Sequence, residues 1–258
     1  MNKTTLCIRL AAGLMILTTV LPTQAQDDLE ARTQQASSYN DKGVAAVEAG
    51  NFDDAIKLFN EAIRIRSDYA IAYGNLGAAF YHKRRFEEAI TVLKKAIQLN
   101  SNYAEHYNKL GVIYAETRNN EEAVKWLERA VRLQPNYASK HYNLGCVYIR
   151  LQRFKEAVSA LEQSAQLEPN SLETRLNLGY AYAMQKRYRE AITEMQKAVR
   201  LNPNDEQAQL LLSNFHLLAQ DKHSALAQIK EVKATNPQLA QKLYRTFYSD
   251  KIVTVPDK

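Results

Sequence analysis

The sequence is short of cysteine, glycine and proline, and the first shortage excludes a disulfide-stabilised fold. Its 258 residues contain two cysteines, eight glycines and six prolines. Cys7 lies in an N-terminal segment that is predicted to be removed, so Cys146 is alone in the remaining chain. Without an internal disulfide, the fold has to depend on packing, even in an oxidising compartment. Cys146 is expected to be a modest apolar filler, with a linked dimer as the minority alternative.

Motifs for catalysis and for metal binding are also missing. The chain has no Gly-x-Ser-x-Gly motif, no glycine-rich phosphate loop and no Cys–His–Asp arrangement. The five histidines occupy unrelated positions, and none has the spacing of paired zinc ligands. They are His82, His106, His141, His216 and His223. The sequence therefore predicts no enzyme activity, no metal and no cofactor.

The chain also lacks a patch of one charge. Its formal charge is +6, and its basic residues alternate with acidic pairs such as Glu87-Glu88 and Glu121-Glu122. Loss of Lys3 and Arg9 with the N-terminal segment lowers the charge to +4. A nucleic-acid-binding protein is expected to carry a stronger and more concentrated basic footprint. We therefore expect no nucleic-acid partner.

Residues 1–25 have the pattern of a secretory signal peptide. Lys3 and Arg9 form a positive start, residues 10–21 are apolar, and small residues precede a cleavage site after Ala25. An uncleaved spanning helix is the rival interpretation, but twelve apolar residues reach only about 18 Å of the roughly 30 Å hydrocarbon core. A lipoprotein anchor is disfavoured because Cys7 precedes the apolar run. The prediction is a secreted or periplasmic protein with no membrane span after cleavage.

A repeat of 34 residues fills most of the remaining chain. Each copy contains two segments with apolar residues at helical spacing, joined by a short polar turn, as in Tyr107–Tyr114 and Ala123–Val131. The six copies span residues 36–69, 70–103, 104–137, 138–171, 172–205 and 206–239. One helical hairpin cannot cover its own apolar face, whereas stacked copies can cover one another. The sequence therefore predicts an elongated all-α protein.

Small residues recur at two positions of the repeat and mark the places where helix axes approach closely. The first position holds Gly43, Gly77, Gly111, Gly145 and Gly179, with Ser213 in the last copy. The second holds Ala55, Ala89, Ala123, Ala157, Ala191 and Ala225, and a third, large apolar position holds Phe59, Leu93, Leu127, Leu161, Met195 and Ile229. Because proline cannot continue a helix, Pro135, Pro169, Pro203 and Pro237 are expected to end the second helices. Asp68, Asn102, Asn136, Asn170 and Asn204 are expected to be N-caps of the helices that follow.

These positions closely resemble the pattern of the tetratricopeptide repeat (TPR) family. The third copy matches it with Tyr107, Leu110, Gly111, Tyr114, Ala123, Leu127 and Pro135. The copies depart from it at His141 and Arg175 in the leading aromatic position, and at Ala46 and His216 in the later tyrosine position. The resemblance implies a right-handed α-solenoid of antiparallel helix pairs, made of six TPRs and a C-terminal capping helix.

The segments at both ends of the repeats differ from them. Residues 26–35 are polar, without apolar periodicity, and are expected to form a flexible lead-in. In residues 240–258, Leu243, Tyr244 and Phe247 share one helical face, which predicts a short helix over the last repeat. The tail from Lys251 to Lys258 is apolar in patches and has no assigned structure.

The resemblance implies that the first helices of a TPR line a concave surface. A polar row on it would be Asn75, Lys109, Asn143 and Asn177, with Tyr81, Tyr142 and Tyr180 nearby and Arg85, Arg150, Arg153 and Arg187 along the far side of the same helices. Asparagine both donates and accepts hydrogen bonds, so such a row could hold the backbone of an extended peptide. The alternative is that the asparagines follow the family consensus at a solvated position. A clamp for a terminal carboxylate is absent, because Asn40 and Val44, Gly74 and Ala78, and Asn108 and Val112 stand where lysine and asparagine would be needed.

Three functions follow as hypotheses. The first is a scaffold that binds an extended segment of a protein partner in its groove, in the assembly of a cell-envelope complex. The second is a structural dimer or adaptor that uses its convex and C-terminal surfaces. The third is an accessory subunit that positions a separate enzyme. Fold alone does not choose among them.

Overall fold

The computed structural model of the protein describes residues 3–249, and all regular structure in that range is helical. The residues form two compact units, 1–113 and 114–258, which we describe separately. The first unit contains α1 (Lys3–Glu48), α2 (Phe52–Ile65), α3 (Ala70–His82), α4 (Phe86–Leu99) and most of α5 (Ala104–Glu116). The second contains α6 (Asn120–Leu133), α7 (Ala138–Arg150), α8 (Phe154–Leu167), α9 (Leu172–Met184), α10 (Tyr188–Leu201), α11 (Glu206–Leu218), α12 (Lys222–Thr235) and α13 (Pro237–Ser249).

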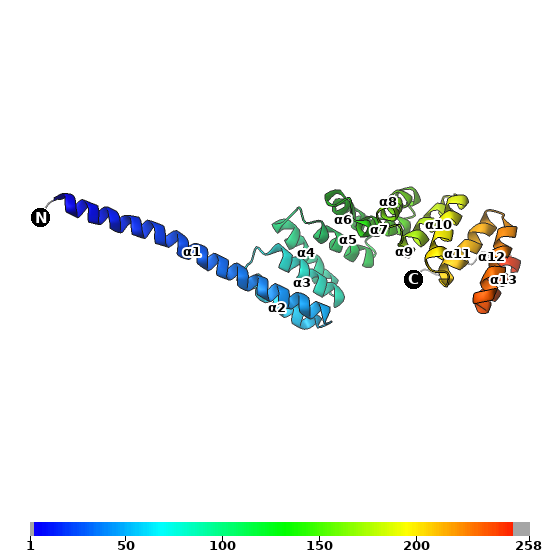
Figure 1. Cartoon of the computed structure of the whole chain (residues 1–258), viewed down its shortest axis with the longest axis horizontal. Coiled ribbons are helices and arrows are strands. Elements are labelled where there is room, and N and C mark those ends of the chain that lie inside the picture. Colours follow the sequence, from blue (N-terminus) through cyan, green and yellow to red (C-terminus); the bar gives the residue numbers. More distant parts are fainter. Residues whose placement is uncertain (1–2, 250–258) are drawn as a thin grey trace. The chain divides into compact units, whose positions relative to one another are not determined.

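Within each unit, consecutive helices pack as antiparallel pairs, for example α3 with α4 and α7 with α8 (Figure 1). From α3 onward, helices with odd numbers up to α11 begin at 34-residue intervals, and so do those with even numbers from α2 to α12. The fold is an all-α solenoid of helix pairs, as the repeat predicts.

The predicted glycines and alanines lie where two helices of a pair come together. A Cβ at Gly77 would be 2.6 Å from Leu93 Cγ, and a Cβ at Gly145 would be 2.6 Å from Leu161 Cγ. The alanines of the second helices are fully buried throughout the repeat position. The glycine positions at Gly43, Gly77, Gly145 and Gly179 therefore receive the large apolar side chain of their own second helix.

The turn inside each hairpin uses one left-handed residue. These residues are Gly50, Arg84, Arg118, Gln152, Lys186 and Gln220, with φ between 57° and 76°. Only the first is glycine, the residue that enters this conformation without steric cost. The other five hairpins therefore keep the turn at some cost in free energy.

The turn between hairpins corrects one prediction. The asparagines and Asp68 were expected to cap the following helix, but the caps are one residue later, at Tyr69, Tyr137, Ser171 and Asp205. A different asparagine, the one that directly follows the preceding helix, forms a hydrogen bond within the turn: Asn202 Oδ1 accepts the Asn204 N–H at 3.2 Å. Only Ser171 and Asp205 use their side chains as caps in this set.

The prolines end the second helices as predicted. Pro135, Pro169 and Pro203 each follow the last residue of α6, α8 or α10 by two positions. Pro237 opens α13, where its missing N–H costs nothing.

At the N-terminal end, residues 26–35 belong to α1 and are not an irregular lead-in. Their side chains are exposed except for Thr33, which is half-buried. Their composition of Gln, Asp, Leu, Glu, Ala and Arg includes several good helix formers, so the helix that begins the first repeat extends back through them. The helical backbone also continues across Ala25, and cleavage there stays a prediction.

At the other end, α13 covers the last hairpin. Leu239, Ala240 and Leu243 are buried against Ile229 and Val232, and Tyr244 and Phe247 pack beside them. This matches the predicted apolar face. The tail from Lys251 to Lys258 lies outside the described residues.

Candidate functional site

The predicted polar row divides between the two units, and in each unit one asparagine of the row forms a hydrogen bond with the preceding hairpin. In the first unit, Asn75 Nδ2 donates to Asn40 Oδ1 at 2.9 Å. In the second unit, Asn177 Nδ2 donates to the Tyr142 hydroxyl at 3.2 Å and to the Glu173 carbonyl at 3.0 Å. The row asparagine in both cases bonds to the residue 35 positions earlier, in the preceding hairpin. These hydrogen bonds occupy amide N–H groups that would otherwise be able to bind the backbone of a peptide. Asn143 lies half-buried on α7.

Lys109 is the exception in this row. It lies on α5, half-buried, and no hydrogen bond or ion pair reaches its amine from the described residues of the chain. Burial lowers the pKa of the Lys109 amine, while the nearby Glu105 acts in the opposite direction. An amine that has lost water without gaining a partner is an unusual feature, because buried charges are normally paired.

A cavity of about 230 Å³ lies beside Lys109 in the first unit. Its lining comes from two first helices, α3 and α5, and is mainly apolar with a few polar groups. The lining residues are Gly77, Ala78, Tyr81, His82, Asn108, Lys109, Val112 and Ile113. Apolar walls with few polar groups are typical of ligand pockets. The structure thus brings two of the predicted site residues, Tyr81 and Lys109, to one cavity.

The other predicted tyrosines lie in the second unit. Tyr142 is half-buried and accepts the bond from Asn177; burial, the largest cause, raises the pKa of the Tyr142 hydroxyl. Tyr180 is 37% exposed and packs edge-to-face on Phe154, with ring centroids 6.4 Å apart.

Three of the four predicted arginines correct the expected placement, whereas Arg150 lies on a first helix as expected. Arg85, Arg153 and Arg187 do not lie on the first helices but are N-cap residues of α4, α8 and α10. Each pairs with the glutamate three residues later, and each guanidinium lies over an aromatic ring, as Arg153 does over Tyr148 at 4.6 Å. Arg150 ends α7, and its Nη1 donates to the Ala115 carbonyl at 2.9 Å. The contacts of Arg85, Arg153 and Arg187 stay within their own repeats, whereas Arg150 reaches the preceding repeat.

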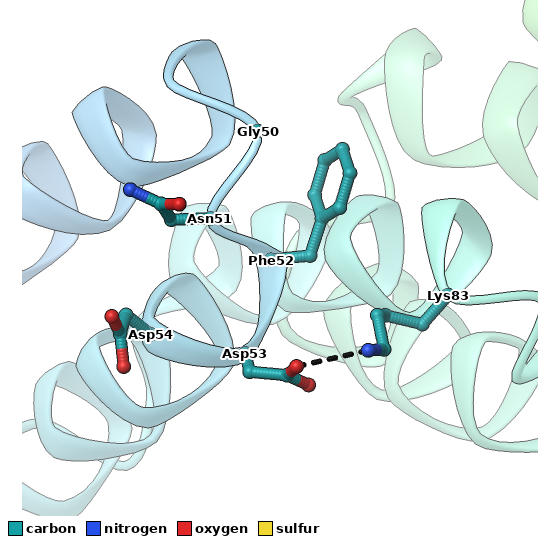
Figure 2. A pocket seen from close by; sticks show the side chains of 6 residues that line it. All are labelled: Gly50, Asn51, Phe52, Asp53, Asp54 and Lys83. Atoms are coloured by element: carbon teal, nitrogen blue, oxygen red, sulfur yellow. Dashed lines mark hydrogen bonds and ion pairs between the residues drawn. The ribbon is translucent and has the colours of Figure 1, made fainter.

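A second cavity, of about 250 Å³, lies at the first hairpin turn (Figure 2). Asp53 and Lys83 form an ion pair at 2.9 Å across it, and Phe52 stacks on His82 with centroids 4.7 Å apart. The sequence does not reveal this site, because its two sides come from different hairpins. Both sides of the ion pair are exposed, and such pairs contribute little free energy.

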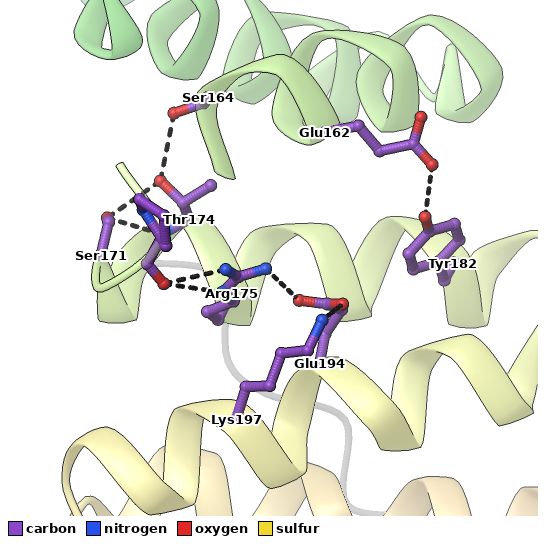
Figure 3. Close-up of polar contacts among 9 residues, drawn as sticks. Glu162, Ser164, Ser171, Thr174, Arg175, Tyr182, Glu194 and Lys197 are labelled. Atoms are coloured by element: carbon purple, nitrogen blue, oxygen red, sulfur yellow. Dashed lines mark hydrogen bonds and ion pairs between the residues drawn. The ribbon is translucent and has the colours of Figure 1, made fainter. Parts of the chain in front are cut away.

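The second unit holds a buried polar network that the repeat pattern does not reveal (Figure 3). Arg175 Nη1 pairs with Glu194 Oε2 at 2.6 Å, and Lys197 bonds the same carboxylate at 2.7 Å. Arg175 also donates to the Pro169 carbonyl at 2.8 Å. Nearby, Tyr182 donates to Glu162, and Thr174 bonds Ser171 and Ser164.

Arg175 shows how the network follows from the repeat. It replaces the leading aromatic residue, as His141 does, and both side chains bond the carbonyl of the residue six positions earlier. Tyr107, which keeps the family residue, bonds the Ser101 carbonyl in the same way. The departures from the pattern therefore preserve a hydrogen bond to the preceding turn.

Within the described residues, no group of His, Cys, Asp or Glu side chains is placed to hold a metal ion. No helix in residues 3–249 combines the length and the apolar character needed to cross a membrane.

Residues 9–242 match the family model described as the cilia and flagella-associated protein 70 C-terminal domain, a TPR domain. No curated protein matches the chain.

Solved structures with the same fold include three TPR proteins. YrrB, described as a TPR protein with an unusual peptide-binding site, has a TM-score of 0.65 at 24% identity, covering 72% of this chain and 97% of its own. PilF of Pseudomonas aeruginosa has a TM-score of 0.70 at 22% identity, covering 86% and 100%. MamA has a TM-score of 0.59 at 26% identity, covering 62% and 94%. At these identities the first two likenesses concern the fold alone.

Proposed function

Because the chain belongs to the tetratricopeptide repeat family, whose members are generally protein–protein interaction scaffolds, we propose that it binds an extended segment of a protein partner. The segment lies on the face formed by the first helices, beginning at the cavity between α3 and α5. The role of the chain is binding, and any chemistry belongs to a partner.

The cavity beside Lys109 is the observation that carries this proposal. Its lining comes from first helices alone, on the face where the family resemblance implies that a peptide would lie. It offers an aromatic ring at Tyr81, an amide at Asn108 and an amine at Lys109 beside apolar walls. Aromatic groups and charged groups in a partly desolvated site are typical of binding hot spots. The peptide-binding site described for YrrB gives a precedent on the same fold.

Filling the cavity tests the proposal. Ala78→Trp places a bulky ring in the half-buried wall, whereas Gln98→Trp places the same ring on the exposed side of α4. Tagged full-length protein is crosslinked in its native compartment and the captured partner is identified. We expect Ala78→Trp to reduce capture at least tenfold and Gln98→Trp to leave it unchanged. Equal capture by both variants, with unchanged helicity, would refute binding at this cavity.

We also propose that the protein acts in the periplasm or outside the cell, in the assembly of an envelope complex. The positive start, the apolar residues 10–21 and the small residues before Ala25 support this compartment. Mass analysis of the protein from cell fractions should find a chain that begins at Gln26 in the envelope or secreted fraction. A chain that keeps Met1 and stays in the cytoplasm would contradict this.

One observation favours self-association as a second candidate. Tyr248 on α13 is 76% exposed, although it stacks on Tyr244 and contacts Phe247. Such an exposed aromatic surface could join two copies. Sedimentation at about 50 μM, which detects contacts in the micromolar range, would show a dimer that Tyr248→Ser weakens. A monomer at that concentration would exclude this candidate.

A further inference from the structure

The Lys109 amine has no partner because the residue that would bond it is a glycine. Asn75 bonds Asn40, and Asn177 bonds Tyr142, in each case 35 residues earlier in the chain. Counting back 35 residues from Lys109 reaches Gly74. Glycine has no side chain, so the bond found elsewhere in the row cannot form here.

The space above Gly74 is taken by His106. A Cβ on Gly74 would collide with His106 Nε2, so a larger residue there would displace the imidazole ring. His106 is 1% exposed. No residue of α3 is acidic, and the acid nearest to Lys109 in sequence, Glu105, makes no ion pair with it. The first unit thus holds a partly desolvated amine that forms no ion pair with a carboxylate of the described residues, although the charge of Glu105 acts on it from farther away.

The cavity next to this amine indicates what the missing carboxylate is attached to. Ala78, Val112 and Ile113 give the lining its apolar character, and Tyr81 adds an aromatic ring. An acidic group on a short apolar stem, with an apolar neighbour, would satisfy both the amine and the walls. A carboxylate that replaces lost water forms a charge-assisted hydrogen bond, which is stronger than a neutral one.

We propose that Lys109 and the cavity between α3 and α5 bind an acidic side chain, next to an apolar side chain, within an extended segment of the partner. This rests on the proposed function and names the class of segment that it accepts. The acid is a side chain and not a chain end. A terminal carboxylate would need several polar groups, but the four positions that would clamp it, Gly74, Ala78, Asn108 and Val112, provide only the one amide of Asn108.

The test uses synthetic peptides and the full chain labelled with ¹⁵N. The first peptide is Ser-Gly-Ser-Leu-Glu-Phe-Ser-Gly-Ser with both ends blocked, and the second has Gln in place of Glu. The third is the Gln peptide with a free C-terminal carboxylate. We expect the Glu peptide to shift the amide signals of Gly77, Ala78 and Val112 at millimolar concentration or below. Both Gln peptides should bind at least tenfold more weakly.

Two lysine variants complete the experiment. Lys109→Met removes the charge while keeping most of the length of the side chain, and Lys95→Met does the same on the exposed face of α4. We expect Lys109→Met to reduce affinity for the Glu peptide about tenfold and to leave its weak binding of the blocked Gln peptide unchanged. Lys95→Met should change neither.

The outcomes separate this inference from the proposed function. If all peptides shift the α3 and α5 signals equally, and Lys109→Met has no effect, the cavity binds peptides but the acidic specificity is wrong. If the Gln peptide with a free end binds as well as the Glu peptide, the carboxylate is terminal and the assignment is overturned. If no peptide shifts these signals, the inference fails, while capture of a partner by the native protein decides the proposed function independently.

Discussion

The two units build the same helix pair but treat its polar positions differently. In the second unit, Asn177 has Tyr142 as a partner, Arg150 bonds the end of α5, and Arg175 is buried against Glu194. In the first unit, Asn75 has a partner, whereas Lys109 has a glycine 35 residues earlier and lines a cavity. The comparison teaches that the residue 35 positions earlier, in the preceding hairpin, decides how a side chain of the polar row is used. Where that residue can form a hydrogen bond, the side chain joins two hairpins; where it is glycine, the side chain stays available for binding.

The largest expected effect comes from breaking the buried pair of the second unit. Glu194→Ala leaves the Arg175 guanidinium buried without its carboxylate, which should cost about 3–5 kcal/mol of unfolding free energy. Glu88→Ala removes an exposed pair of the first unit with Arg85 and should cost less than about 1 kcal/mol. Urea unfolding followed by circular dichroism measures both. Similar losses from both variants would show that burial does not distinguish these pairs.

Acid should destabilise the first unit through His106. Burial, the largest cause, and the charge of Lys109 lower the pKa of His106 to about 4. The unfolded state, with a His pKa near 6.5, therefore binds the proton first, and stability falls as the pH decreases from about 6.5 to about 4. The loss reaches about 3 kcal/mol at the lower end, at about 1.4 kcal/mol per pH unit.

Unfolding of His106→Ala over the same pH range provides the comparison. Alanine is the residue at the equivalent positions Ala72 and Ala208, and it does not titrate. The variant should lose less stability than the native chain between pH 6.5 and pH 4, whatever its stability at neutral pH. His223→Ala, on the exposed side of α12, is the matched control. Parallel pH profiles for the native chain and His106→Ala would contradict the assignment.

Adding a side chain at Gly74 in the first unit should have an intermediate effect on the free energy of unfolding. Gly74→Ala places a methyl group where the His106 ring lies, and overpacking of this kind costs about 1–3 kcal/mol. The measurement is the midpoint of urea unfolding. An unchanged midpoint would show that His106 moves aside freely and that the space beside α3 is not rigidly held.

The smallest effect concerns the left-handed position of the hairpin turns, which is glycine only in the first hairpin of the described residues. Gly50 occupies the left-handed position in the first hairpin, and Gln152 occupies it in the α7–α8 turn. Gln152→Gly should stabilise the chain by about 1 kcal/mol, because a left-handed non-glycine residue costs about that amount. Thermal unfolding should show a small rise in Tm. A fall in Tm would mean that the flexibility of glycine in the unfolded chain outweighs the relieved strain.

The sequence predicts the helix pairs well because their packing depends on local spacing. Gly77 and Leu93 are in the same hairpin, and the repeat alone indicates that they meet. The position of the helix caps was off by one residue, because the turn can satisfy its N–H groups through Asn202 as well as through the following asparagine. The repeat pattern does not distinguish these two local arrangements.

The candidate site was only partly predictable. The pattern places Asn75, Lys109 and Asn177 in one row, but the partners of the two asparagines come from the preceding hairpin and differ in residue type. Arg85, Arg153 and Arg187 were misplaced because the family resemblance assigns faces to positions near the helix ends, where these side chains turn toward local glutamates. The difference between Gly74 and Asn40 is visible in the sequence, yet its meaning depends on knowing which residues meet across two hairpins.

The central claim, that the first helices hold a segment of a partner at the α3–α5 cavity, is tested most directly by site-specific photocrosslinking. A photoreactive phenylalanine replaces Val112 in the cavity wall or Gln98 on the exposed face of α4, and the protein is irradiated in its native compartment. The account predicts one crosslinked partner from the Val112 position and none from the Gln98 position. A partner that crosslinks at Gln98 and not at Val112 would contradict it.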